Sequence, residues 1–147
     1  MSERLETLKR HPYRVSYGGR DLGILSEMPD IRIAHRRRDY RRYGSDGGDE
    51  AVSEIVEAAA RIAVGCCDIA TALELAAAFA VGDDVIAPER ARELVLAPPA
   101  GSGEKTLRFP RTVLLPELEY SPRPDNHRAK LTFMALPDAD GTLYVFA

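Results

Sequence analysis

The residue types that most often carry chemistry are scarce in this 147-residue chain and are not spaced for it. Its three histidines, His11, His35 and His127, stand far apart, without the i, i+4 partner or the cysteine pair that a zinc site uses. Its two cysteines, Cys66 and Cys67, are neighbours, and two small buried thiols are the simplest interpretation of them. We therefore expect no metal site and no cofactor. Because no nucleophile, base and orienting group occur at a recognisable spacing, we also expect that the protein is not an enzyme.

Two loops resemble ligand sites only superficially. In residues 101–106 a glutamate, Glu104, stands where a phosphate loop requires glycine before its lysine. Asp138 and Asp140 lack the glycine and the distal glutamate of a calcium loop. We expect a flexible connector in the first case and a chain-reversing turn in the second.

One segment concentrates charge. Its arginines are interleaved with tyrosines and followed by an acidic, glycine-rich stretch, and the predicted interface set is Arg36, Arg37, Arg38, Tyr40, Arg41, Arg42, Tyr43, Asp46, Asp49 and Glu50. Positive charge with aromatics is typical of nucleic-acid surfaces. The adjacent carboxylates instead favour pairing within a loop or across a protein interface, where arginine is enriched. We favour the interface; a nucleic-acid-binding module that uses Arg36 to Arg42 is the alternative.

The composition indicates one globular domain. Forty-five per cent of residues are hydrophobic and 29% charged, and the net charge of -3 gives the whole molecule no reason to seek nucleic acid or an anionic membrane. The first residues lack the apolar core of a secretory signal, and the longest uncharged run is far below the roughly 20 residues that span a bilayer. We expect a polar arm over residues 1–12, one domain over 13–147, and no membrane contact.

The first predicted element after residue 12 is a β-hairpin. Residues 13–17 and 22–24 alternate in hydrophobicity around Gly18 and Gly19, which suit a type I′ turn. A short strand is expected over 31–34, and a helix over 72–80, where Thr71 and Glu74 have the spacing of a capping box. Residues 83–97 are expected to be irregular or to hold a helical turn after Pro88.

The remaining elements read as extended chain. Residues 107–115 carry Pro110, and Pro116 follows, which confines this strand to edges or bulges. Residues 131–135 alternate, a turn follows at 137–141, and residues 143–146 are expected to return as the partner strand.

The apolar residues within 50–66 fit the spacing of a helix and also the alternation of a strand. As a helix they form an apolar stripe with Glu50, Glu54 and Glu57 mostly opposite, and the alanines favour that choice intrinsically. As a strand, every second residue from Val56 to Cys66 shares one face. Propensity alone predicts a helix, and the periodicity leaves both open.

The chain from residue 13 to 146 resembles phage tail tube proteins. The resemblance rests on Tyr-Arg-Val-Ser-Tyr-Gly-Gly-Arg-Asp-Leu-Gly from Tyr13 to Gly23, on Tyr43-Gly44, and on the long apolar segment that runs into a capped helix. The ending adds Arg-Phe-Pro-Arg at 108–111, Pro-Glu-Leu-Glu at 116–119 and Leu-Thr-Phe-Met-Ala-Leu-Pro-Asp-Ala-Asp-Gly at 131–141.

The resemblance implies a mainly β (α+β) fold, an antiparallel β-sandwich or small barrel with one flanking α-helix, in which residues 53–66 form a long strand. It also implies a structural virion protein of the phage tail, assembled in the host cytoplasm, whose hexameric rings stack into a tube through which DNA passes without specific binding. Implied partners are further copies of itself and tape measure, terminator, and baseplate or tail-tip proteins. Another neck or tail-end ring protein, a terminator or distal tail protein, is the alternative.

A stacking subunit needs loops that reach the next ring, and residues 36–54 are expected to form such an extended inter-ring loop. A channel for DNA should not attract the polyanion, so we expect carboxylates to face it. The candidates are Glu57, Asp83 and Asp84.

Overall fold

The computed structural model describes residues 13–25, 29–43, 48–66, 68–122 and 128–147. The arm predicted over residues 1–12 and the interface residue Asp46 lie outside these ranges. The elements, in chain order, are β1 (Arg14–Tyr17), β2 (Arg20–Ile24), β3 (Asp30–Tyr43), β4 (Asp49–Cys66), α2 (Ile69–Ala76), the 3-10 turn η1 (Pro88–Arg90), β5 (Arg92–Ala97), β6 (Leu107–Ser121), β7 (Arg128–Leu136) and β8 (Val145–Phe146).

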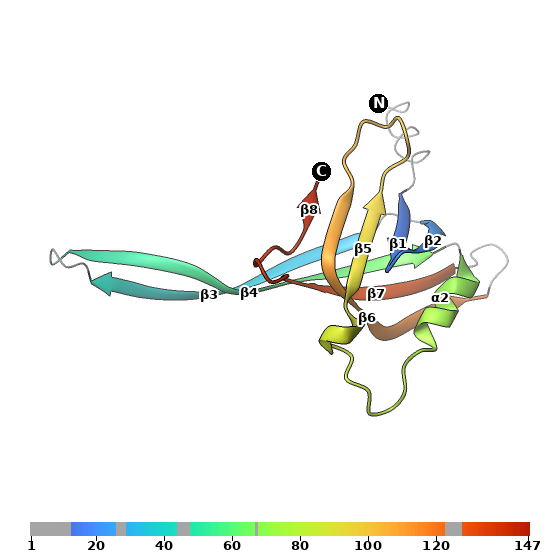
Figure 1. The fold of residues 1–147 in the computed structure, drawn as a ribbon, viewed down its shortest axis with the longest axis horizontal. Coiled ribbons are helices and arrows are strands. Elements are labelled where there is room, and N and C mark those ends of the chain that lie inside the picture. The colour runs from blue at the N-terminus through green and yellow to red at the C-terminus, as the bar shows by residue number, and fades with distance from the viewer. Residues whose placement is uncertain (1–12, 26–28, 44–47, 67, 123–127) are drawn as a thin grey trace.

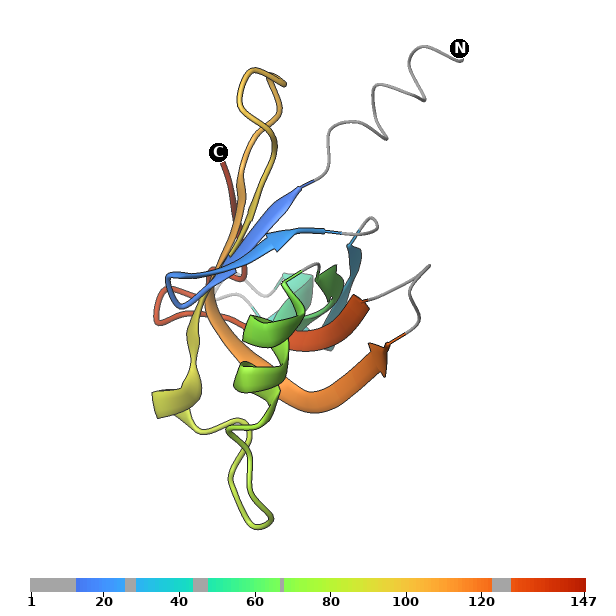
Figure 2. The same cartoon turned by 90° about the vertical axis from the view of Figure 1, so that its right-hand side faces the viewer.

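The strands form one antiparallel sheet in the order β2-β1-β5-β6-β7-β4-β3, with β8 paired to the start of β6. The sheet curls so that its two halves face each other, and α2 packs across β7 and β6 (Figure 1; Figure 2). A single bridge between Leu25 and Cys66 brings the end of β2 to the end of β4, but the sheet is not closed. The expected mainly β fold with a flanking helix is confirmed, as an open sandwich rather than a closed barrel.

The core lies between the two halves of the sheet. Ile62 and Val64 of β4 and Leu131 and Phe133 of β7 are buried there, because alternate residues of a strand point to the same face. This face is called the core-side face, and the opposite one the outer face. Tyr17 of β1 completes the packing, with its ring centroid 4.9 Å from that of Phe133.

Residues 50–66, whose apolar pattern fits both a helix and a strand, belong to a strand. β4 pairs with β3 along its length and with β7 over Ala60–Cys66, so its backbone groups are satisfied across the sheet. Ile62 and Val64 are fully buried, whereas Arg61 between them is exposed. The helix predicted from alanine propensity is therefore wrong, because burial against neighbouring strands outweighs a weak intrinsic preference. The strand implied by the resemblance is confirmed.

Several local predictions are confirmed. Gly18 and Gly19 turn the β1–β2 hairpin with φ of 59° and 83°, and η1 follows Ala87 as expected. Pro110 and Pro116 both lie in β6 where its pairing register shifts, toward β5 and β7 respectively. At a bulge the missing N–H of proline costs no ladder hydrogen bond.

Other predictions need correction. The helix spans Ile69–Ala76, not 72–80, because Asp68 rather than Thr71 caps it and accepts hydrogen bonds from the Thr71 amide (3.1 Å) and hydroxyl (2.9 Å). β8 pairs with β6 and not with β7, since the turn held by Asp138 carries the chain away from β7. β5 was not predicted: residues 92–97 pair with both β1 and β6.

Candidate subunit interface

The outer part of the β3–β4 ribbon leaves the body of the protein. β4 pairs with β7 only from Ala60 onward, so residues 34–43 and 49–59 project as a two-stranded ribbon, called here the extension (Figure 1). The predicted loop at 36–54 is thus corrected: residues 36–43 and 49–54 are strand. Cross-strand pairing, with one register shift between Arg36 and Arg37, gives these backbone groups partners that a loop would lack. The short strand expected at 31–34 is likewise the beginning of β3.

A β-bulge lies within the extension, a few residues beyond the point where β4 stops pairing with β7. Arg36 pairs with Glu57 but the next residue, Arg37, pairs with Ile55, so Val56 is the extra residue of β4. A bulge bends the strand and increases its twist. It therefore sets the direction in which the extension points.

The outer face of the extension pairs opposite charges across the strands. Arg36 lies 2.9 Å from Glu57, and Arg38 lies 3.1 Å from Glu54. The Arg38 guanidinium also stands 5.1 Å from the centroid of the Tyr40 ring. Hydrogen bonds from Arg38 and Tyr40 hold the pKa of the Glu54 carboxyl below its usual value. Arg36 and Arg38 on this face are thus paired with carboxylates of the same chain.

The core-side face of the extension is different, because its cross-strand pairs do not match. Arg37 lies opposite Ile55, which is 60% exposed, and Arg41 lies opposite Ala51. Asp39 is satisfied by the Ser53 hydroxyl at 2.7 Å. Near the tip, Tyr43 is 77% exposed. This face therefore combines arginine with exposed apolar and aromatic surface, which is typical of protein interfaces.

The predicted interface residues thus divide between two faces. Arg36, Arg38, Tyr40 and Arg42 point to the outer face with Glu50 opposite Arg42, and Arg37, Arg41 and Tyr43 point to the core-side face. Sequence reasoning missed the partners Glu54, Glu57 and Ile55 because it treated the segment as a loop. A hairpin register centred near residue 46 would have found Glu54 and Ile55, since it sets them opposite Arg38 and Arg37, but Glu57 faces Arg36 only because of the bulge at Val56.

The charges of the extension balance. It holds five arginines, at 36, 37, 38, 41 and 42, and five carboxylates, at 39, 49, 50, 54 and 57, so their sum is zero. A nucleic-acid surface instead presents a net positive stripe to the phosphates. The balance weighs against the nucleic-acid alternative.

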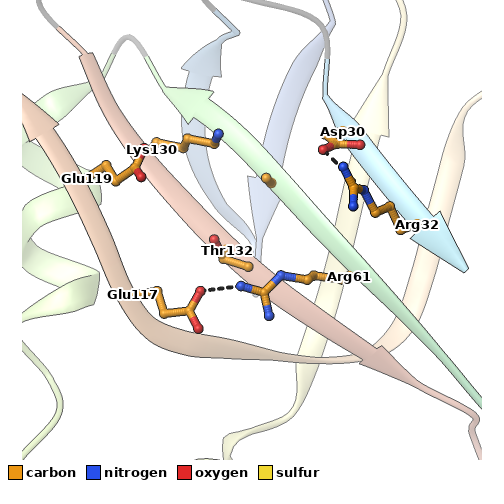
Figure 3. A pocket seen from close by; sticks show the side chains of 8 residues that line it. Asp30, Arg32, Arg61, Glu117, Glu119, Lys130 and Thr132 are labelled. Carbon is orange, nitrogen blue, oxygen red and sulfur yellow. Dashed lines mark hydrogen bonds and ion pairs between the residues drawn. The ribbon is translucent and has the colours of Figure 1, made fainter. Parts of the chain in front are cut away.

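The outer face of the body continues this charged surface. A depression of about 300 Å³ there is crossed by Arg61, which forms an ion pair with Glu117, and by Arg32, which lies 3.6 Å from Asp30 (Figure 3). Lys130 and Glu119 face each other on β7 and β6. Each positive group in the depression is therefore set beside a carboxylate.

The proposed channel-facing carboxylates do not gather on one surface. Glu57 points to the outer face and pairs with Arg36. Asp83 and Asp84 belong to the connector between α2 and η1, on the side of the sheet that α2 covers, and Asp83 pairs with Arg90 at 2.8 Å. One continuous acidic lining formed by all three is not compatible with this arrangement.

Among the described residues, no group of three or more His, Cys, Asp and Glu is arranged to hold a metal ion. None of the described helices is long and apolar enough to cross a membrane.

Comparison with known proteins gives similarity at the level of structure. No family model and no curated protein matches the sequence. A chain of the tail of an empty GTA particle, refined with C6 symmetry, aligns at 13% identity and a TM-score of 0.52, over 95% of this chain and 96% of the other. A chain of the PVC sheath/tube terminator of an extracellular contractile injection system aligns at 10% identity and a TM-score of 0.55, over 92% and 93%. A chain of the anti-feeding prophage tube-terminating cap aligns at 12% identity and a TM-score of 0.54, over 92% and 87%. The protein therefore has the fold of chains found in tail and tube assemblies.

Proposed function

We propose that this protein is a structural, self-assembling subunit of a phage tail or tail-like particle and that it has no catalytic role. Copies form rings, six-membered as the resemblance implies, that stack into a tube through which DNA passes. The observation that carries the proposal is the extension, in a chain whose fold matches those of tail and tube assemblies over almost its whole length.

The extension is costly to leave without a partner. Beyond Ala60 both of its edges are unpaired, and an isolated two-stranded ribbon is at best marginally stable in water. Ile55 and Tyr43 are exposed on it without any described cover. Arginines along the edge strand β3 discourage indiscriminate strand pairing. A surface of this kind is suited to a specific partner, and a repeated copy supplies one in every ring.

The extension would make the contacts between copies, through the predicted interface residues of both its faces. Tape measure, terminator and baseplate or tail-tip proteins would meet the ends of the assembly. The particle tail would be the site of the mature protein, after assembly in the host cytoplasm.

Negative-stain electron microscopy of the purified protein tests the proposal. We expect rings and, at higher concentration, stacked tubes, with sedimentation coefficients that rise with concentration. A protein that stays monomeric at high concentration, alone and with tail partners, would overturn it.

A terminator that forms a single ring is the second candidate. It is supported by the similarity to the sheath/tube terminator and to the tube-terminating cap, whose TM-scores of 0.55 and 0.54 are comparable to the 0.52 of the tail chain and the 0.55 of a chain of the PVC sheath-tube complex. The same micrographs separate the two functions: a terminator stops at one ring, whereas a tube subunit continues to stack.

A further inference from the structure

The two edges of the extension are not protected alike. On β3, five of the seven residues from 36 to 42 are arginines, and charged residues along an edge discourage the pairing of a further strand. On β4, residues 51–55 include one charged residue, Glu54, whose carboxylate is already held by Arg38 at 3.1 Å. These residues lie beyond the bulge at Val56, so their register with β3 is regular. We call residues 51–55 of β4 the open edge.

A third strand on the open edge would stabilise the extension. A two-stranded ribbon is marginal in water, whereas three strands with apolar side chains to pack are stable. Because β7 pairs with β4 only from Ala60 onward, the open edge leaves backbone groups without a strand partner among the described residues. Val52 and Ile55 offer an apolar side chain on each face of this edge. A short uncharged strand would therefore fit it.

β8 is a strand of that kind. It pairs with β6 on one side, with Val145 opposite Arg108 and Phe146 opposite Leu107, and no strand within the described ranges covers its other edge. Residues 144–146 are uncharged, and each of their side chains is between 44% and 59% exposed. Pairing with β6 holds β8 apart from the extension of its own chain (Figure 1), so β8 can reach the open edge only of another copy.

The other free edges of the sheet fit the open edge less well. β2 carries the charged residues Arg20 and Asp21, and its pairing with β1 shifts register near Gly23, whose φ is 83°. The open edges of two copies could also meet each other, but that contact is isologous and closes after two copies. A contact between β8 and β4 joins two different surfaces, so it repeats head to tail from copy to copy.

We propose that β8 of one copy adds as a strand to the open edge of β4 in the next copy and makes that extension three-stranded. Residues 144–147 pair with residues 51–55, and main-chain hydrogen bonds supply the affinity, as in other cases of strand addition. The exposed apolar side chains of both strands then cover each other. The inference rests on the proposed assembly and specifies which strands meet in it.

Cysteine cross-linking tests the pairing, because a disulfide needs Cα atoms within about 7 Å and opposed residues of paired strands stand about 4.5–5.5 Å apart. Val145→Cys or Phe146→Cys, on opposite faces of β8, is combined with Ala51→Cys, Ser53→Cys or Ile55→Cys on the open edge. After oxidation of the assembled protein with diamide, at least one combination should give a ladder of dimers, trimers and longer covalent chains on a non-reducing denaturing gel. The wild type, with its native cysteines, gives the background.

The matched control replaces Ser53→Cys by Asp39→Cys. These two residues lie opposite each other and share a hydrogen bond of 2.7 Å, so both changes remove the same contact and differ in the edge that carries the thiol. We expect no ladder from the control, because a strand on the open edge stands about 9–10 Å from β3, two strand spacings away.

Three results would contradict the pairing while leaving the proposed function intact. The first is an equal ladder from the Asp39→Cys control, and the second is rings or tubes without a ladder from any combination. The third is covalent dimers from Ser53→Cys alone without longer chains from the combinations, which would show that the open edges of two copies meet each other. A wild type that never assembles would overturn the proposed function itself.

Discussion

Arg36 and Glu57 form the last ion pair between β3 and β4 before the bulge at Val56, with their charged atoms 2.9 Å apart. One residue further along β3, Arg37 faces Ile55 instead of a carboxylate. The bulge is thus the boundary between the base of the extension, residues 34–36 and 57–59, and its outer part, residues 37–43 and 49–55. Assembly should depend on the part beyond this boundary, and folding on the part before it.

Deleting Val56 should change the direction of the extension without unfolding the protein. The deletion makes the register between Arg36 and Arg37 regular while keeping every other β3–β4 pair, so the fold should persist. The bend at the bulge should disappear, and the extension should then miss its partner. We expect an unchanged far-ultraviolet circular dichroism spectrum with loss of large species in sedimentation. Normal assembly of the deletion variant would show that assembly does not depend on the direction that the bulge gives to the extension.

An exposed apolar residue of the extension should matter for assembly only. Because the Ile55 side chain is 60% exposed, Ile55→Asp should change the free energy of unfolding by within about 0.5 kcal/mol. Assembly should weaken, since the aspartate would be buried against a neighbour. Ile24→Asp, at the opposite end of the sheet on β2, is the control at 45% exposure. Equal effects of the two changes on assembly would contradict a role for the extension.

A substitution in the core, unlike one on the extension, should lower the free energy of unfolding. Phe133 is fully buried and packs against Tyr17, so Phe133→Ala should lower the free energy of unfolding by about 3–5 kcal/mol. Chemical denaturation of the unassembled protein at low concentration measures this loss. A change below about 1 kcal/mol would mean that the two halves of the sheet do not pack as described.

Tyr17 predicts a loss of stability at high pH. Its hydroxyl proton has two carbonyl acceptors within reach, that of Arg90 at 3.1 Å and that of Thr112 at 3.0 Å, and burial raises its pKa above the usual 10.0. The unfolded chain then loses this proton first, so the contribution of Tyr17 is complete below pH 10 and is lost as the pH rises through the folded-state pKa. Tyr17→Phe should cost about 1 kcal/mol at pH 7 and flatten the decline in stability above pH 10. An identical pH profile for the variant would refute this role.

The sequence predicted the features that depend on local chemistry. The Gly18-Gly19 turn, the proline positions in β6 and the helical turn at Pro88 all follow from backbone restrictions of single residues. The overall fold could be predicted only from the resemblance to tail tube proteins, because alternating hydrophobicity in short strands does not specify which strands pair. Thus β8 was expected against β7 but pairs with β6, and β5 was missed altogether.

The residues of the candidate interface were chosen from the sequence, but the strand register and the faces on which they lie were not predicted. A cluster of arginines beside carboxylates indicates pairing, yet only the register shows that Arg36 and Arg38 are satisfied within the chain while Arg37 faces Ile55. The length of β4 could not be predicted from residues 50–66 alone, since their alanines suit a helix and their burial is decided by β3 and β7.

Shortening the extension tests whether the extension is needed for assembly. Replacing residues 37–56 by Asn-Gly joins Arg36 to Glu57 through a two-residue turn and leaves all pairing of β4 with β7 in place. Sedimentation velocity of the full chain and of the shortened chain, at matched concentrations, is the measurement. We expect rings or tubes for the full chain and a folded monomer for the shortened one; assembly of the shortened chain to the same extent as the full chain would contradict a role of the extension in assembly.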